Sequence, residues 1–185
     1  IDAMVALAKK HDLLIFLDEV QCGMGRTGKL FAHEYYGFTP DILCTAKGIG
    51  GGFPLGALFA TERAAQYMKA GSHGTTYGGN PLAMAVGNAV LDIMLADGFM
   101  DKVNQRAKHL AEGLQGLVAQ FPKLYTEHRG LGMMQGVQCR EGVDNRKLIE
   151  VMHKEGLISI PAGDNMVRIL PPLIISEKEI DEGIT

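Results

Sequence analysis

The stretch Leu13-Leu-Ile-Phe-Leu-Asp18 contains the first strong structural signal of this chain. A continuous apolar run that ends in a carboxylate is typical of a parallel strand buried on both faces. Short apolar runs at 42–45 and 57–60 predict two further strands. A helix is expected over Pro81–Ala96, with Asn80 as its N-cap and the apolar character of a buried core helix. Because strands, loops and helices alternate, this part of the chain predicts an α/β fold.

The rest of the chain has a different pattern, and it predicts a second domain. Apolar residues recur every three or four positions from Met100 to Phe121, which predicts one amphipathic helix with a charged outer face. The elements expected after it are a strand near 133–139, a helix at 145–154, strands near 157–160 and 167–170, and a helix start at Ser176 with Glu179 in a capping box. We therefore expect an α/β domain over residues 1–98 and a smaller α+β domain over residues 99–185.

The composition excludes several classes of protein. A net charge of −3 gives no electrostatic case for binding nucleic acid, and 46% apolar residues argue against disorder. Cys22, Cys44 and Cys139 are far apart, and no His or Cys pairs at metal-ligand spacing, so we expect neither disulfides nor a metal site. Free thiols fit a reducing compartment and predict a cytoplasmic protein. The most apolar helix is too short to span a bilayer, so no membrane partner is expected.

Asp18 and Lys47 are the candidate catalytic residues, because each one follows a predicted strand. In open parallel sheets, ligands bind in the crevice at the carboxyl ends of the strands. A carboxylate there favours a cationic partner, although an Asp at such a position also caps loops. Lys47 precedes Gly48-Ile-Gly-Gly-Gly52, where bare backbone would let a desolvated, nucleophilic amine reach a bound aldehyde. A lone lysine is usually a surface residue, but consecutive glycines are poor surface filler.

Two further segments contain candidate anion-binding groups. The stretch His73-Gly-Thr-Thr-Tyr-Gly-Gly-Asn80 brings hydroxyls and free amides to a helix N-terminus, where a phosphate would bind, although it also fits an ordinary N-capping loop. Arg168 is a single arginine within an apolar strand. If it points inward, a carboxylate matches its guanidinium; if it lies at an edge, it faces water.

Two glycine-rich segments resemble nucleotide-binding motifs only superficially. Gly23-Met-Gly-Arg-Thr-Gly28 matches the dinucleotide pattern G-x-G-x-x-G, but that pattern must follow a strand at once and open a helix. Four residues intervene after Asp18, and the residues from Lys29 onward are no convincing helix start. The run from Gly48 to Gly52 lacks the Gly-Lys-Ser/Thr order of a P-loop. A nicotinamide-dependent enzyme remains the alternative enzyme class.

Three of these segments together resemble the class III aminotransferases, which are pyridoxal 5'-phosphate enzymes of fold type I. The segments are Leu17-Asp-Glu-Val-Gln-Cys-Gly-Met-Gly-Arg-Thr-Gly28, Ala46-Lys-Gly-Ile-Gly-Gly-Gly-Phe-Pro-Leu-Gly56 and His73-Gly-Thr-Thr-Tyr-Gly-Gly-Asn-Pro81. The resemblance is ordered and covers nearly the whole chain. It implies that the first domain is the C-terminal part of a large, mostly parallel-sheet domain, and that the second is the small C-terminal domain.

The resemblance also implies a role for each matching residue. Lys47 would be the lysine that bonds the cofactor covalently and later moves the proton, and Asp18 would pair with the protonated ring nitrogen. Val20 would pack on one face of the ring, and Gln21 would hydrogen-bond the ring hydroxyl. The remaining assignments are Thr76, with Thr75 as a weaker candidate, for the cofactor phosphate of the partner subunit in a homodimer, and Arg168 for the substrate α-carboxylate.

The activity implied is transfer of an amino group between N-acetylornithine and 2-oxoglutarate in arginine metabolism. The amino-acid sequence is most similar to that of enzymes that use N-acetylornithine, and the similarity includes Pro161-Ala-Gly-Asp-Asn165 before Arg168. Enzymes that use ornithine, succinylornithine or 4-aminobutyrate share most of these segments. Both ends of the chain fall in apparent helices, which indicates a segment of a longer protein. The resemblance implies that the phosphate cup and the ring-stacking residue lie upstream. The alternative outside enzymology is an inactive folding or dimerisation fragment.

Overall fold

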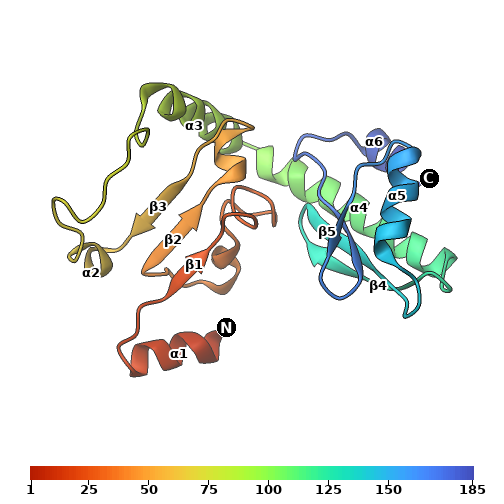
Figure 1. Ribbon diagram of the computed structural model, residues 1–185, viewed down its shortest axis with the longest axis horizontal. Helices are drawn as coiled ribbons and strands as arrows, with labels where there is room; N and C mark the ends of the chain where they lie inside the picture. Colours follow the sequence, from red (N-terminus) through yellow and green to blue (C-terminus); the bar gives the residue numbers. More distant parts are fainter. The chain divides into compact units, whose positions relative to one another are not determined.

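The computed structural model describes residues 1–185, which divide into two compact units (Figure 1). The N-terminal unit is Ile1–Phe99 and the C-terminal unit is Met100–Thr185. No single helix is long and apolar enough to cross a membrane; α3 (Pro81–Met94) and α4 (Phe99–Gln120) reach that length and composition only when the broken pair is taken together. The predicted fold class, α/β followed by α+β, is confirmed.

A three-stranded sheet forms the centre of the N-terminal unit. Its strands are β1 (Phe16–Asp18), β2 (Ile42–Thr45) and β3 (Ala57–Ala60), in the order β1-β2-β3. β1 and β2 are parallel, whereas β2 and β3 are antiparallel. β2 and β3 have the predicted bounds, but β1 begins three residues later than the apolar run, at Phe16 instead of Leu13.

The expectation that the first strand and the helix at Pro81 would be buried is wrong for this chain. Leu13 is 57% exposed and Phe16 is 54% exposed. β1 pairs only with β2 and is therefore an edge strand. In α3, only Ala83, Gly87 and Met94 are buried. The physical reason is that the sheet has three strands, and a sheet of this size leaves apolar surface that further layers would have to cover.

The cap and the packing of α3 follow from the sequence. The Asn80 side chain accepts a hydrogen bond from the N–H of Ala83 at 2.9 Å, as predicted for an N-cap. α3 packs against η2 (Lys47–Gly50), the short 3₁₀ turn after β2. A Cβ added at Gly87 would lie 2.8 Å from Leu55 Cδ2, so glycine permits this close approach. α3 therefore helps to fix the turn that begins with Lys47.

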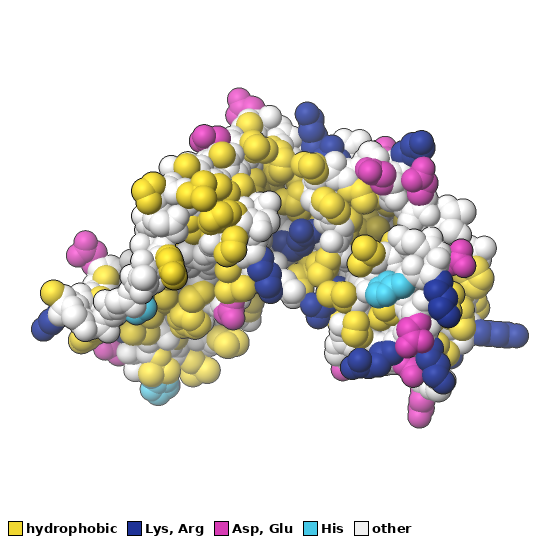
Figure 2. Space-filling model, turned by 45° about the horizontal axis from the view of Figure 1, so that its top comes forward, with side chains coloured by type: hydrophobic (Ala, Val, Ile, Leu, Met, Phe, Trp, Pro, Cys, Tyr) yellow, Lys and Arg dark blue, Asp and Glu magenta, His cyan; other side chains and the backbone are white.

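Short elements complete the N-terminal unit. They are α1 (Asp2–Lys10), the 3₁₀ helix η1 (Ala32–Tyr36) and α2 (Glu62–Ala65). α1, β1 and η1 line a cavity of about 630 Å³ whose wall is mostly apolar. Figure 2 shows many hydrophobic side chains on the surface of this unit; among the most exposed are Met4, Leu58, Tyr67, Met68 and Tyr77.

The C-terminal unit is a four-stranded antiparallel sheet with helices. Its elements are α4, β4 (Tyr125–Leu131), β5 (Met134–Cys139), α5 (Asn145–Lys154), β6 (Ile160–Ala162), β7 (Met166–Ile169) and α6 (Glu177–Ile184). The strand order is β4-β5-β7-β6. The amphipathic helix, α5 and the Ser176–Glu179 capping box are confirmed, with Ser176 Oγ accepting from the N–H of Glu179 at 3.2 Å. β4 was not predicted, and β6 begins three residues later than expected.

One face of this sheet is buried and the other is open. The core joins Val137 and Val167 of the sheet to Leu110 and Leu114 of α4, together with Ile149 and Ile180. Because side chains alternate along a strand, the neighbours of Val137 and Val167 point away from this core. Arg168, next to Val167, therefore lies on the open face, which is where a ligand could reach it.

Two glycines of α4 provide a matched test of this packing. A Cβ at the exposed Gly116 would meet nothing within 4 Å, whereas a Cβ at Gly113 would overlap Ile184 of α6. Gly116→Ala should stabilise the helix by about 0.5–1 kcal/mol, because alanine loses less backbone freedom on folding. Gly113→Ala should gain less or nothing, because α6 must move. Urea denaturation of the two variants measures the difference, and equal gains would contradict this contact.

Candidate active site

The carboxyl ends of β1 and β2 bring together the two residues predicted to be catalytic. Asp18 is the last residue of β1, and its register partner is Cys44, three residues before Lys47. Because β1 and β2 are parallel, both ends lie at the same edge of the sheet. This is the edge at which open α/β sheets bind ligands.

Lys47 has an unusual backbone conformation at the start of η2. Its φ is +50°, which few residues with a side chain adopt and which costs on the order of 1–3 kcal/mol. The following Gly48 lies against Met24, since a Cβ there would be 2.9 Å from Met24 Cβ. Lys47 is exposed and its amine has no hydrogen-bond or ion-pair partner. The desolvation expected of this amine is therefore absent from this chain, because its own residues do not cover it.

Asp18 caps its own loop with one oxygen and leaves the other free. Oδ1 accepts a hydrogen bond from the N–H of Val20 at 2.9 Å, so the loop-capping interpretation describes part of its role. Oδ2 has no partner, and the residue is exposed. Val20 and Gln21, the predicted ring contacts, are half-buried in the turn that follows.

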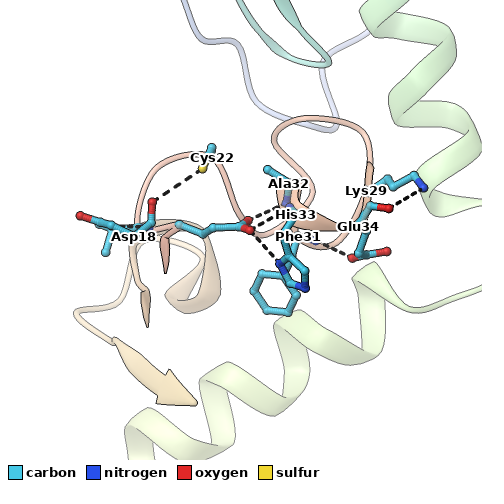
Figure 3. A network of polar contacts seen from close by, with 9 residues as sticks. Asp18, Cys22, Lys29, Phe31, Ala32, His33 and Glu34 are labelled. Atoms are coloured by element: carbon cyan, nitrogen blue, oxygen red, sulfur yellow. Dashed lines mark hydrogen bonds and ion pairs between the residues drawn. The ribbon is translucent and has the colours of Figure 1, made fainter. Parts of the chain in front are cut away.

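A second carboxylate, that of Glu19, was not singled out from the sequence. Glu19 is only 3% exposed and accepts three hydrogen bonds from Ala32 and His33 of η1 (Figure 3). Burial, then the charges of Glu19 and Asp18, raises the pKa of the nearby Cys22 thiol. The only sequence signal for this residue is its position, directly after an aspartate at a strand end. Its hydrogen-bond partners are 13 and 14 residues away, so no local sequence pattern predicts them.

Thr75 and Thr76 lie apart from this arrangement. Both are exposed on the loop before α3, together with every residue from Gly71 to Gly79. Thr75 Oγ1 accepts from the N–H of Gly78 at 3.2 Å, and Thr76 makes no polar contact. Neither hydroxyl makes a polar contact with Lys47 or Asp18 within the unit.

Arg168 lies in one row across the open face of the C-terminal sheet. Arg129 of β4 pairs with Gly136 of β5, and Gly136 pairs with Arg168 of β7. A cavity of about 310 Å³ has Arg129, Gly136, Arg168 and the turn at Asp164 in its wall. Arg129 is already engaged, through Glu127 at 2.6 Å, Asp164 at 3.2 Å and Gln138 at 2.6 Å. A Cβ at Gly136 would lie 2.6 Å from Val167 O, so glycine is needed at the middle position of this row.

The glycine pattern from Gly23 to Gly28 does not form a dinucleotide site. This segment is a series of turns, with Gly25 donating its N–H to Leu30 O at 3.1 Å and Gly28 donating to Gly25 O at 3.0 Å. The next element is the short 3₁₀ helix η1, so the glycines do not open an α-helix. The nicotinamide alternative therefore loses the element that would bind a pyrophosphate.

Comparison with known proteins gives consistent matches over the whole chain. The family model "Aminotransferase class-III" matches residues 1–185. Curated acetylornithine aminotransferases from Brucella melitensis and Mesorhizobium japonicum are 54% and 52% identical over 178 residues, which is 96% of this chain and 44% of each relative. A solved N-acetylornithine aminotransferase from Stenotrophomonas maltophilia has a TM-score of 0.85 at 34% identity, over 97% of this chain and 47% of that one.

An ornithine aminotransferase from Plasmodium yoelii is also similar in structure, with a TM-score of 0.90 at 29% identity over 99% of this chain and 49% of that one. The chain thus spans less than half the length of the relatives that it matches. The family match extends from the first residue to the last and includes both β1–β2 and the C-terminal sheet. The chain belongs to the class III aminotransferase family.

Proposed function

We propose that the protein containing this chain is a pyridoxal 5'-phosphate-dependent aminotransferase that moves an amino group between N-acetylornithine and 2-oxoglutarate in arginine metabolism. The observation that carries the proposal is the shared sheet edge of Asp18 and Lys47, which gives a carboxylate with one unengaged oxygen and an amine without a partner at the carboxyl ends of adjacent parallel strands. The acetylornithine name of the relatives at 52% and 54% identity supports the choice of substrate.

Ornithine is the alternative substrate, and one structural comparison supports it. An ornithine aminotransferase has a TM-score of 0.90 to this chain, although its identity is only 29%. N-acetylornithine is favoured because sequence identity is much higher for the relatives named after it. Succinylornithine and 4-aminobutyrate enzymes remain less supported members of the same class.

The residues at the sheet edge fit pyridoxal phosphate by the chemistry of their groups. The cofactor presents an aldehyde to a lysine amine and a ring nitrogen to a carboxylate. Lys47 has an unengaged amine, and Asp18 has an unengaged Oδ2 whose direction is set by the hydrogen bond from Val20 to Oδ1. Both groups are exposed at one edge, so a planar ring can reach both. When bound, the cofactor supplies an electron sink for the carbon that carries the reacting amino group.

Each of the predicted site residues has a separate role in this proposal. Lys47 would hold the cofactor covalently, and its amine would move a proton to and from the reacting carbon of the substrate. Asp18 keeps a proton on the ring nitrogen, because its negative charge favours the cationic ring. Val20 covers one face of the ring, and Gln21 hydrogen-bonds the ring hydroxyl. Arg168 binds the α-carboxylate of the substrate with its planar guanidinium.

A homodimer accounts for the remaining predicted site residues. Thr75 and Thr76 are on a fully exposed loop and do not contact the site of their own unit. We infer that Thr76, with Thr75 beside it, binds the cofactor phosphate of the partner subunit. The large apolar exposure of the N-terminal unit supports burial against other protein, which in a longer chain includes the rest of the large domain (Figure 2). In this proposal, residues 1–98 belong to that domain and 99–185 form the small domain.

Chemical trapping tests the attachment residue. Borohydride reduction of the full-length holoenzyme should fix the cofactor on the peptide that contains Lys47, because this amine lies at the sheet edge without a competing partner. Mass spectrometry of the digest identifies the peptide. Lys47→Arg should abolish the label, whereas Lys29→Arg, in the nearby turn, should keep it. A label on any other lysine would show that the assignment is wrong.

An amide at position 18 separates electrostatics from loop capping. Asp18→Asn keeps an oxygen for the N–H of Val20 but loses the charge that holds the proton on the ring nitrogen. We expect kcat to fall roughly a hundredfold or more, as for loss of other preorganised electrostatic groups, with circular dichroism unchanged. Asp18→Ala loses both functions and should also weaken cofactor binding. Near-normal turnover in Asp18→Asn would refute the role.

Replacement of Arg168 tests the carboxylate site. Arg168→Lys keeps the charge but loses the bidentate pair of N–H donors, so kcat/KM should fall for the amino donor and for the oxo acid alike, roughly tenfold to hundredfold. Arg146→Lys, at an exposed position on α5, is the matched control and should change neither value. If the substitution changed only the preference for the acyl group on the side chain of the amino donor, Arg168 would not be the residue that binds the α-carboxylate.

A further inference from the structure

We propose that Glu19, paired with His33, is the positioning residue that holds Asp18 in place for the cofactor ring. The inference rests on the proposed function, because it assumes that Asp18 contacts the ring nitrogen. It gives a role to the Glu19 carboxylate and the His33 imidazole, which have no role in the proposed reaction. It also concerns residues that touch neither substrate nor cofactor in that scheme.

Glu19 is a buried carboxylate whose two oxygens are both engaged by donors of one distant element. Oε2 accepts from the N–H of Ala32 at 2.5 Å, and Oε1 accepts from the N–H of His33 at 2.9 Å and from His33 Nδ1 at 2.8 Å. All three donors come from η1, thirteen or fourteen residues along the chain. The substitution Glu19→Gln would leave one acceptor oxygen in place of two and would point N–H groups of the new amide at other donors.

His33 is held by this contact and by aromatic packing. A carboxylate only accepts hydrogen bonds, so the 2.8 Å contact places a proton on Nδ1. The ring stacks on Phe31 at 5.9 Å with an interplanar angle of 22°, and it meets Phe38 edge-on at 6.2 Å. Phe31 in turn packs against Phe59 of β3 at 6.0 Å. Glu19 is thus anchored to a cluster that reaches the far strand of the sheet.

The anchor acts on Asp18 through the peptide that the two residues share. The N–H of Glu19 donates to Cys44 O at 2.9 Å, and its carbonyl accepts from the N–H of Gly23 at 3.0 Å. Together with the bond from Val20 to Asp18 Oδ1, these contacts fix the backbone on both sides of the Asp18 side chain. Adjacent residues at a strand end point in opposite directions, so Glu19 reaches Ala32 and His33 of η1 while Asp18 points away from them.

In this proposal Glu19 holds the backbone in place and Asp18 contacts the cofactor ring. Asp18 is exposed and has one weak local constraint on its side chain, so its free Oδ2 keeps a defined direction only if the backbone beneath it is rigid. A buried carboxylate with three donors supplies this rigidity better than apolar packing, because its hydrogen bonds are directional. Loss of the His33 donor should therefore loosen Asp18 without removing it.

A double-mutant cycle in the full-length protein tests the inference. His33→Phe keeps a ring between Phe31 and Phe38 but removes the donor to Glu19, and His33→Gln returns an amide donor at similar reach. Absorbance titration of each apoprotein with pyridoxal phosphate gives the dissociation constant, and circular dichroism melting of the apoprotein gives the stability. The same measurements are made on Asp18→Asn and on the pair His33→Phe with Asp18→Asn.

We expect His33→Phe to raise the dissociation constant about tenfold and to lower kcat with KM for both substrates unchanged, and His33→Gln to restore most of the affinity. In the Asp18→Asn background, the effect of His33→Phe on affinity should largely disappear, because the two residues act through one contact. Additive effects, or an unchanged affinity in His33→Phe, would overturn the inference while leaving the proposed function intact. Failure of the wild-type protein to bind pyridoxal phosphate would overturn both.

Discussion

The parallel register between β1 and β2 is the constraint on which the candidate site depends. It places Asp18 opposite Cys44 and so brings the end of one strand beside the turn that begins with Lys47. A shift of one residue would reverse the faces of every side chain in β1. The buried Glu19 would then take the exposed direction and Asp18 the buried one. Hydrogen bonds at both ends oppose such a shift, since Ile15 O accepts from the N–H of Ile42 at 3.0 Å and Cys44 O accepts from the N–H of Glu19 at 2.9 Å.

The turn after β2 converts this register into a defined place for the amine. Gly48 lies against the buried Met24, and a Cβ at Gly51 would be 2.9 Å from Val90 Cγ2 of α3. The turn is therefore enclosed by the glycine-rich loop on one side and by α3 on the other. Lys47 keeps its positive φ because these contacts determine the conformation of the turn around it. Gly48 and Gly51 therefore allow the close packing that holds the turn at Lys47.

The sequence predicted the elements whose signals are local, such as the 3.6-residue period of α4 and the caps at Asn80 and Ser176. β4 was missed because it is mostly polar with one buried residue, and its strand state comes from pairing with β5, which is a tertiary effect. The site shows the same limit. Asp18 and Lys47 could be chosen because each follows a strand, but the burial of Glu19 and its pairing with His33 depend on the path of the chain back to η1. Long-range polar partners have no periodicity, so they become visible only in three dimensions.

Two adjacent carboxylates consequently have different roles because their surroundings differ. Glu19 uses both oxygens for donors of η1 and is only 3% exposed, so it is tied to the protein and is not accessible to a ligand. Asp18 uses one oxygen for its own loop and keeps the other exposed. Burial with donors to both oxygens favours a structural role, and exposure with an unengaged oxygen favours binding. The proposed assignment of Asp18 to the cofactor therefore rests on the burial of its neighbour as much as on its own position.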